Sequence, residues 1–144
     1  MAIGIDFGGT KIEGVVLDES GNHLHSVSGH QIARELFRKR VETQPEKGYS
    51  YILNRIKGLY DELAAGIQNA PHTFGIGTPG AISPRTGLLK NSNTVCMNGQ
   101  PLKTDLERIL GRKIEIQNDA NCFAMAEALY GAGKGRKLVF GVIM

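Results

Sequence analysis

The stretch IGIDFGGTK, residues 3–11, decides the fold of this 144-residue chain. Its alternating isoleucines and Phe7 predict a short apolar strand that runs directly into two glycines. A second strand is predicted over residues 12–17, so residues 7–11 form a tight turn between two strands.

This turn has the composition of a phosphate-binding site. Adjacent Gly8 and Gly9 let the backbone approach an anion and point successive amide groups at it. Thr10 adds a hydroxyl donor and Lys11 a cation. Asp6, at the end of the strand, is placed to hold Mg²⁺ through water, because magnesium keeps several of its waters. A hairpin turn that merely requires glycine remains the alternative.

The pattern outside this turn predicts an α/β fold with a mixed sheet. A polar turn over residues 18–22 and one or two strands within 23–41 complete a run of three strands. The elements expected after them are a helix over 52–67, a buried strand over 74–77, a long ordered loop or small hairpin over 81–100, a helix over 101–110, a strand over 113–117 and a helix over 120–130. This is a βββαβαβα order, and an apolar run, Leu138–Ile143, predicts one more strand buried on both faces.

Two further motifs follow predicted strands. GIGTPG, residues 75–80, is typical of a rigid strand-to-loop turn that brings backbone close to a small ligand, with a simple turn as the alternative. NDAN, residues 118–121, lies where a strand meets a helix, so Asn118 is a natural N-cap and Asp119 is favoured by the helix dipole. A carboxylate there points into the crevice where ligands bind, and Asp119 can accept a proton from an attacking hydroxyl that Asn118 holds.

The three motifs together resemble the ROK family of repressors and sugar kinases. Members of that family open with Asp-x-Gly-Gly-Thr, continue with Gly-x-Gly-x-Pro-Gly and carry Asn-Asp-Ala-Asn at a helix start, and here all three occur in order. The stretches GLLKNSN, residues 87–93, and NGQPL, residues 98–102, are similar to the sugar-side loop of the same family. The similarity is greatest to bacterial fructokinases and related hexose or N-acetylhexosamine kinases.

The resemblance implies a lobe of the actin-like ATPase (ribonuclease H-like) fold, with ATP and a hexose bound in a cleft between two lobes. Residues 8–11 would lie near the ATP phosphates and Asp6 would orient Mg²⁺. The sugar contacts implied are Gly80, Asn91, Asn93 and Asn118. Asp119 would be the general base for a primary hydroxyl, giving a sugar 6-phosphate.

The resemblance also implies that this chain is one half of a kinase. Residues 1–118 would form the N-terminal lobe and residues 119–144 the beginning of a second, truncated lobe. A second phosphate loop, a Glu/His sugar motif and a cysteine cluster for structural zinc belong to the missing half. We therefore expect the fragment to be inactive alone and the full-length protein to form a homodimer. The region 23–34 is longer than usual for the family, which predicts an enlarged hairpin.

Composition narrows the remaining classes of protein. An apolar fraction of 41% with 22% charged residues is that of a globular domain and excludes a disordered chain. The net charge of +3 is dispersed, and the basic run 34–40 is interleaved with apolar residues as in a solvated strand, so we expect no nucleic-acid partner. No signal peptide or membrane span is recognisable, so a cytoplasmic location is expected.

The remaining expectations concern the two cysteines and two alternative functions, a transcriptional regulator and a chaperone or cytoskeletal protein. Cys96 and Cys122 stand apart, as reduced thiols do, and Cys122 is expected to pack in the interior, although a helix start can lower a thiol pKa. A sugar-sensing ROK regulator would need a DNA-binding domain ahead of the glycine turn, which begins here after only a few residues. A chaperone or cytoskeletal relative activates water and needs no alcohol pocket.

Overall fold

A computed structural model describes residues 1–18, 25–27 and 30–142, with backbone alone for residues 25–27 and 30–32. Its centre is a sheet of five strands in the order β5-β2-β1-β6-β9. The strands are β1 (Ala2–Phe7), β2 (Lys11–Asp18), β5 (Arg34–Glu42), β6 (Thr73–Thr78) and β9 (Glu115–Asn118). β1, β6 and β9 run parallel, whereas β2 is antiparallel to both of its neighbours. The mixed α/β sheet predicted from the sequence is confirmed.

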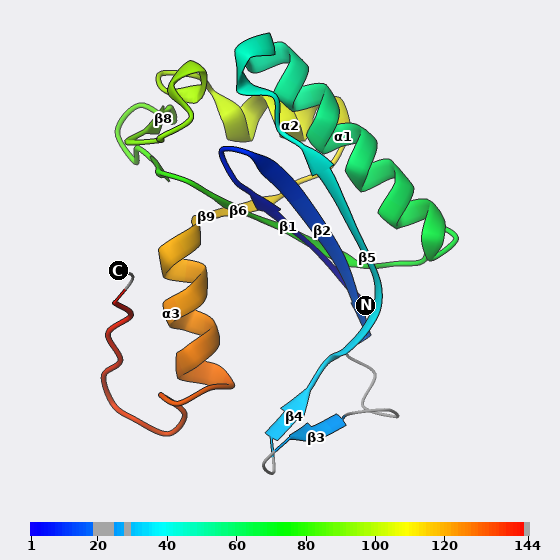
Figure 1. The fold of residues 1–144 in the computed structure, drawn as a ribbon, viewed down its shortest axis with the longest axis vertical. Coiled ribbons are helices and arrows are strands. Elements are labelled where there is room, and N and C mark those ends of the chain that lie inside the picture. The colour runs from blue at the N-terminus through cyan, green and yellow to red at the C-terminus, as the bar shows by residue number, and fades with distance from the viewer. Residues whose placement is uncertain (19–24, 28–29, 143–144) are drawn as a thin grey trace.

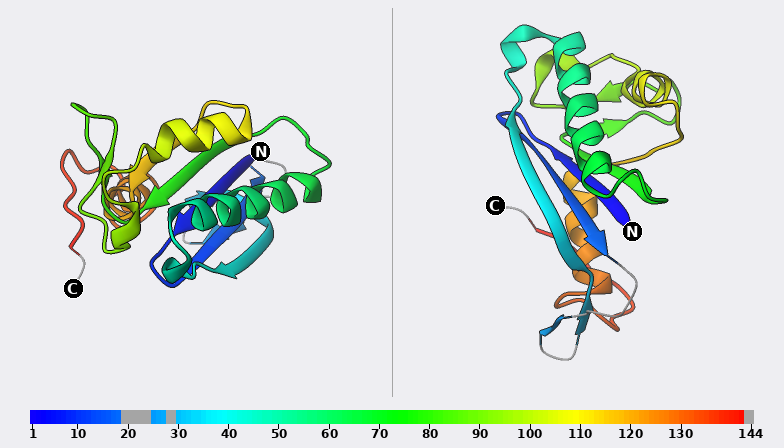
Figure 2. Two further views of the ribbon diagram at one scale, coloured as in Figure 1. Left: turned by 90° about the horizontal axis from the view of Figure 1, so that it is seen from above. Right: turned by 90° about the vertical axis from the view of Figure 1, so that its right-hand side faces the viewer.

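Two helices cover one face of this sheet, and a third lies on the other side (Figures 1 and 2). The covering helices are α1 (Tyr49–Gly66) and α2 (Leu102–Leu110). The third helix, α3 (Asp119–Leu129), begins directly after β9 and projects away from the sheet. Short elements complete the fold: the 3-10 turns η1 (Pro45–Lys47) and η2 (Val95–Met97), and the hairpins β3 (His25–Val27) with β4 (His30–Ile32) and β7 (Ala81–Ile82) with β8 (Leu89–Lys90).

The core lies between the sheet and the two covering helices. Strand β1 alternates, so that Ile3, Ile5 and Phe7 are buried toward α1. The buried residues of α1 recur at helical spacing, which lays one apolar stripe on the sheet. The full set of buried apolar side chains is Ile3, Ile5, Phe7, Ile12, Val16, Ile52, Leu53, Ile56, Leu59, Leu63, Ala64, Phe74, Ile76, Leu89, Met97, Leu102, Leu106 and Ile114.

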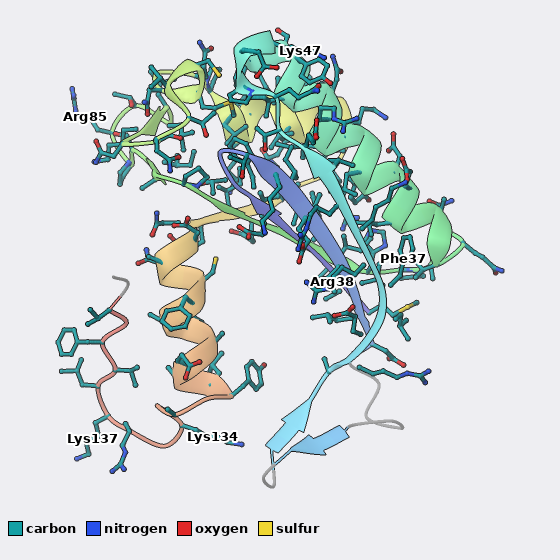
Figure 3. All side chains as sticks on the ribbon, viewed as in Figure 1. Phe37, Arg38, Lys47, Arg85, Lys134 and Lys137 are labelled. Carbon is teal, nitrogen blue, oxygen red and sulfur yellow. The ribbon has the colours of Figure 1, made fainter. Side chains whose placement is uncertain are left out.

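Strand β5 is the edge strand that the basic run 34–40 forms, and its two faces differ. Phe37 points to the end of α1, where its ring approaches Gly66, and Arg38 points to the opposite face (Figure 3). There Arg38 and Arg40 both pair with Glu13 of β2, and the two arginines hold the pKa of that carboxyl below its ordinary value. The predicted solvated strand is confirmed.

Three further predictions concern the hairpins and the polar turn outside the main sheet. The small hairpin expected within residues 81–100 is present as β7 and β8. Strands β3 and β4 form a separate antiparallel pair, in agreement with the enlarged hairpin expected in the region 23–34. Most of the polar turn expected over residues 18–22 lies outside the described residues.

The strand expected at Leu138–Ile143 is wrong for the residues described there. Residues 138–142 form an extended segment without strand pairing, and Leu138, Phe140 and Val142 are 72%, 81% and 74% exposed. The segment lies beside α3, where a Cβ on Gly141 would approach Ala124 and Phe123 within 3.3 Å (Figure 1). A strand requires a hydrogen-bonding neighbour, and residues 138–142 lie beside a helix and pair with no strand of the five-stranded sheet.

Candidate active site

The candidate site forms where the parallel strands β1, β6 and β9 end. The pairing register places Asp6 beside Gly77, and Gly77 beside Gln117. A Cβ on Gly77 would lie 3.9 Å from Asp6 Oδ1 and 3.9 Å from the Cα of Asp119. The sheet therefore brings together the two aspartates that the sequence places 113 residues apart. Carboxyl ends of parallel strands are the usual place for ligands in open α/β sheets.

The electrostatics of Asp6 reflect this proximity. Partial burial raises the pKa of the Asp6 carboxyl above its ordinary value, and the negative charge of Asp119 raises it further. Glu13 acts in the same direction, whereas Lys11 opposes it. Two carboxylates that repel one another at a strand end are suited to a divalent cation, which would relieve the repulsion.

The first two residues at the start of helix α3, Asn118 and Asp119, both make side-chain hydrogen bonds to the backbone. The Asn118 side chain accepts a hydrogen bond from the backbone N–H of Asn121 at 3.3 Å, as predicted for an N-cap. Its Nδ2 donates to the carbonyl of Gly80 at 2.8 Å, which ties the second motif to the third. Asp119 Oδ1 accepts from the N–H of Ala120 at 2.7 Å, so the carboxylate is held at the helix start.

Gly80 is required for the loop that follows β6. Its φ is +90°, and a Cβ there would lie 2.4 Å from the carbonyl oxygen of Lys90 and 2.8 Å from the nitrogen of Ser92. The loop of residues 87–102 is closed by a reciprocal pair, because the Asn98 amide accepts from Ser92 N–H and donates to Ser92 C=O, both at 2.8 Å. Asn91, with φ of 59°, thereby lies against Gly80.

The glycine turn between β1 and β2 is held by a residue that the sequence did not single out. Gly8 N–H donates to Lys11 C=O at 2.9 Å, which closes the turn. Fully buried Thr43 then binds it twice: its hydroxyl donates to Gly8 C=O at 2.7 Å, and its N–H donates to Thr10 C=O at 3.0 Å. A threonine just past the end of a predicted strand was the only signal for this role.

Five of the predicted site residues line two pockets, and the other five line neither: Gly8, Lys11, Gly80, Asn91 and Asn118. One, of about 570 Å³, is lined by Asp6, Gly77 and Asp119 together with the open face of the sheet. The other, of about 700 Å³, is lined by Gly9, Thr10, Pro45, Glu46 and residues 93–96, which include Asn93. Lys11 lies at the start of β2 with its side chain exposed, and it lines neither pocket.

Cys122 differs from its prediction. It is exposed rather than packed in the interior, and its sulfur lies 3.7 Å from the position of a Cβ on Gly77. Partial burial of the thiol raises its pKa, and the carboxylates of Asp119 and Asp6 raise it further. The helix start does not dominate, because the two neighbouring negative charges oppose a thiolate.

Two properties of the described residues bear on metal ions and membranes as partners. No group of three or more His, Cys, Asp or Glu side chains within residues 1–18, 25–27 and 30–142 is arranged to hold a metal ion alone. A magnesium ion held at Asp6 would take its other ligands from water and substrate oxygens, the arrangement usual for this ion. None of the helices in the described part of the chain is both long and apolar enough to cross a membrane.

Known proteins resemble the whole of this chain. The family model described as "ROK family" matches residues 2–144. N-acetyl-D-glucosamine kinase of Yersinia pestis bv. Antiqua (strain Nepal516) is 35% identical over 146 residues, covering 100% of this chain and 51% of that protein. N-acetyl-D-glucosamine kinase of Aliivibrio salmonicida (strain LFI1238) is 36% identical over 146 residues and is covered to 43%. The chain thus spans about half the length of the curated relatives it matches, or less.

Solved structures share the fold. A ROK family glucokinase from Streptomyces griseus, in complex with glucose and AMPPNP, matches with a TM-score of 0.69 and 29% identity, over 93% of this chain and 38% of that one. A ROK hexokinase from Thermus thermophilus matches with a TM-score of 0.69 and 30% identity, over 93% of this chain and 40% of that one. The expected actin-like ATPase lobe is confirmed.

Proposed function

This chain belongs to the ROK family, and from that membership we propose that the complete protein transfers a phosphoryl group from ATP to a primary hydroxyl of a hexose. The observation that carries the proposal is the meeting of Asp6 and Asp119 across Gly77, beside a glycine turn. One carboxylate can serve the metal and the other the alcohol.

Asp119 is the proposed general base. The sugar hydroxyl gives its proton to the Asp119 carboxylate as its oxygen attacks the γ-phosphorus. The bond between that phosphorus and the bridging oxygen breaks, and ADP leaves with the electron pair. One oxygen of Asp119 is held by Ala120 N–H at 2.7 Å, which leaves the other oxygen for the proton.

The remaining residues have positioning roles in the proposal. The turn residues Gly8, Gly9, Thr10 and Lys11 would lie near the ATP phosphates. Asp6 would hold Mg²⁺ through water, and the ion would supply positive charge against the phosphates. Gly80, Asn91, Asn93 and Asn118 contact the sugar. The Asn118 side chain already binds Gly80 and the start of α3, so its support for the sugar includes fixing that loop.

The identity of the hexose is a choice among candidates. The sequence motifs favour a fructokinase or glucokinase, whereas N-acetyl-D-glucosamine kinases, at 35–36% identity, favour an N-acetylhexosamine. We propose a cytoplasmic enzyme, and a homodimer when complete.

The division of the chain into two lobes is also part of the proposal. We propose that residues 1–118 form the N-terminal lobe and that residues 119–144 begin a second lobe, because α3 has no buried residue and its apolar side chains are not confined to one face. This chain alone holds one wall of a cleft, and catalysis by positioning requires both walls. Sugar phosphorylation by purified residues 1–144 would contradict this assignment.

The test is sugar-dependent ADP production by the complete protein, measured with glucose, fructose, mannose, N-acetylglucosamine and N-acetylmannosamine. Asp119→Asn should lower kcat by about 10²–10⁴-fold, the usual contribution of a general base. Asp61→Asn is the matched control, because Asp61 lies on α1 and pairs with Lys57 at the surface. Near-normal turnover by Asp119→Asn would remove that residue from the base role.

A further inference from the structure

Gln117, the residue before the Asn118 cap, makes two hydrogen bonds that the sequence motifs did not include. Its Oε1 accepts from the Asn118 N–H at 2.8 Å and from Asn121 Nδ2 at 3.0 Å. Gln117 belongs to β9, whereas Asn121 lies in the first turn of α3. One oxygen therefore joins the end of the strand to the start of the helix.

The end of β9 lies at the edge of the sheet. In the sheet of the described residues, β9 is an edge strand whose neighbour is β6. The last pair of this ladder is Thr78 with Asn118, so strand pairing ends where α3 begins. A backbone N–H at such an end needs an acceptor from outside the ladder. Gln117 Oε1 supplies that acceptor to Asn118.

Helix α3 is held at its start by polar contacts. The helix has no buried residue and projects away from the sheet (Figure 1). Most helices of globular proteins are instead stabilised by packing of an apolar face. Asn121 binds both residues that precede α3, because its N–H donates to Asn118 Oδ1 at 3.3 Å and its Nδ2 donates to Gln117. Hydrogen bonds, not buried side chains, therefore fix the direction in which α3 leaves β9.

Asp119 lies between the two halves of the clamp that Gln117 and Asn121 form. The hydrogen bonds of this clamp join the residues before Asp119 to the residue two positions after it, which restricts rotation of the backbone that carries the carboxylate. Gln117 also lines the same pocket as Asp6, Gly77 and Asp119. A displacement of about 1 Å in a catalytic group can cost roughly 10²-fold in rate, so a small movement at this junction matters.

We infer that Gln117 is a positioning residue of the proposed reaction: together with Asn121 it fixes the start of α3, so that Asp119 keeps the direction in which it accepts the proton of the hexose hydroxyl. The inference rests on the proposed kinase function and adds two side chains to it. In this role Gln117 acts through Asp119 and does not take the proton itself.

The experiment compares Gln117→Leu, Asn121→Ala and the double variant with the wild type in the complete protein. Leucine keeps the size of Gln117 and removes the acceptor, and alanine removes Nδ2 of Asn121 but keeps its N–H. Each single variant should lower kcat about 10–100-fold, with the KM for ATP unchanged. The thermal unfolding midpoint should stay near that of the wild type, because the lost hydrogen bonds are exposed.

Two comparisons separate positioning from a general effect of the substitutions. Because Gln117 and Asn121 share one interaction, the double variant should lower kcat no further than either single variant. Gln68→Leu makes the same chemical change at an exposed residue that follows α1, and it should leave kcat unchanged.

Each outcome decides for or against the positioning role. A kcat of Gln117→Leu within about twofold of the wild type overturns the inference, and loss of activity in Asp119→Asn in the same assay then leaves the kinase function standing. A double variant whose loss is the product of the two single losses shows that the residues act separately and overturns the clamp. A raised KM with unchanged kcat assigns Gln117 to substrate binding, and a much lower unfolding midpoint assigns it to folding; either result overturns the inference. If the wild type phosphorylates none of the sugars, the proposed function fails and this inference fails with it.

Discussion

Replacing Thr43 with valine should loosen the glycine turn on which the proposed nucleotide site depends. The side chain is fully buried, and its hydroxyl donates to Gly8 C=O at 2.7 Å. Valine keeps the shape and the backbone N–H that binds Thr10 C=O at 3.0 Å, so the substitution deletes one hydrogen bond only. Losing this part-buried hydrogen bond should lower the free energy of unfolding by about 0.5–1.5 kcal/mol.

The same perturbation should affect one substrate more than the other. If the turn orders the amides that bind the ATP phosphates, a looser turn must be ordered again when ATP binds. Each 1.4 kcal/mol corresponds to a factor of about ten, so the KM for ATP should rise about two- to tenfold in Thr43→Val while the KM for the hexose stays near its wild-type value. Thr43→Ser retains the hydroxyl and should behave like the wild type in both respects.

Urea unfolding and steady-state kinetics of the complete protein measure these effects. A Thr43→Val protein with wild-type unfolding free energy and wild-type ATP KM would show that the hydrogen bond does not order the turn. An equal rise in both KM values would point to general loosening of the lobe. Thr104→Val, on the exposed side of α2, controls for the threonine-to-valine change itself.

Two further substitutions test the strand ends. Gly80→Ala should lower the free energy of unfolding by more than the roughly 1–3 kcal/mol of an unfavourable φ alone, because the new Cβ would also lie 2.4 Å from Lys90 C=O. Gly99→Ala is the control, because Gly99 has a φ of 77° and a Cβ there would meet no atom within 4 Å. In urea unfolding, Gly99→Ala should therefore lose less free energy than Gly80→Ala. Asp6→Asn should abolish activity yet stabilise the fold at neutral pH. The raised pKa of Asp6 means that ionisation disfavours the folded state, so the stability it contributes falls as pH rises through the folded pKa. The difference between Asp6→Asn and wild type should therefore vanish in acid, and equal unfolding midpoints at neutral pH would contradict the argument.

The part of the fold that follows from local pattern was predictable from the sequence. Alternation in β1 and helical spacing in α1 specify which faces are buried, and the buried faces specify the layers. The glycine turn and the Asn118 cap were predictable for the same reason, since the residue types are dictated by local backbone geometry.

The contacts that depend on distant segments were not predictable. Thr43 gains its role from a carbonyl 35 residues earlier in the chain, and its own sequence neighbourhood carries no mark of it. Cys122 follows a helix start that favours a thiolate, yet partial burial of the thiol and then the charges of Asp119 and Asp6 raise its pKa. Neither the hydrogen bond of Thr43 nor the direction of the Cys122 pKa shift can be known without the tertiary arrangement.

The segment 138–142 shows how an apolar run can predict the wrong element. Its composition suits a buried strand, but a strand forms only where a neighbour supplies hydrogen bonds. Every residue of the buried core in the described chain lies between Ile3 and Ile114, so this core is packed without α3 or this segment. Large apolar side chains of α3 and the segment remain exposed instead: Phe123, Met125, Leu129, Tyr130, Leu138, Phe140 and Val142. Under the proposed function, Asp119 therefore stands at the boundary between a lobe that is packed and one that begins with unburied apolar surface, which places the general base where two lobes would close on a substrate.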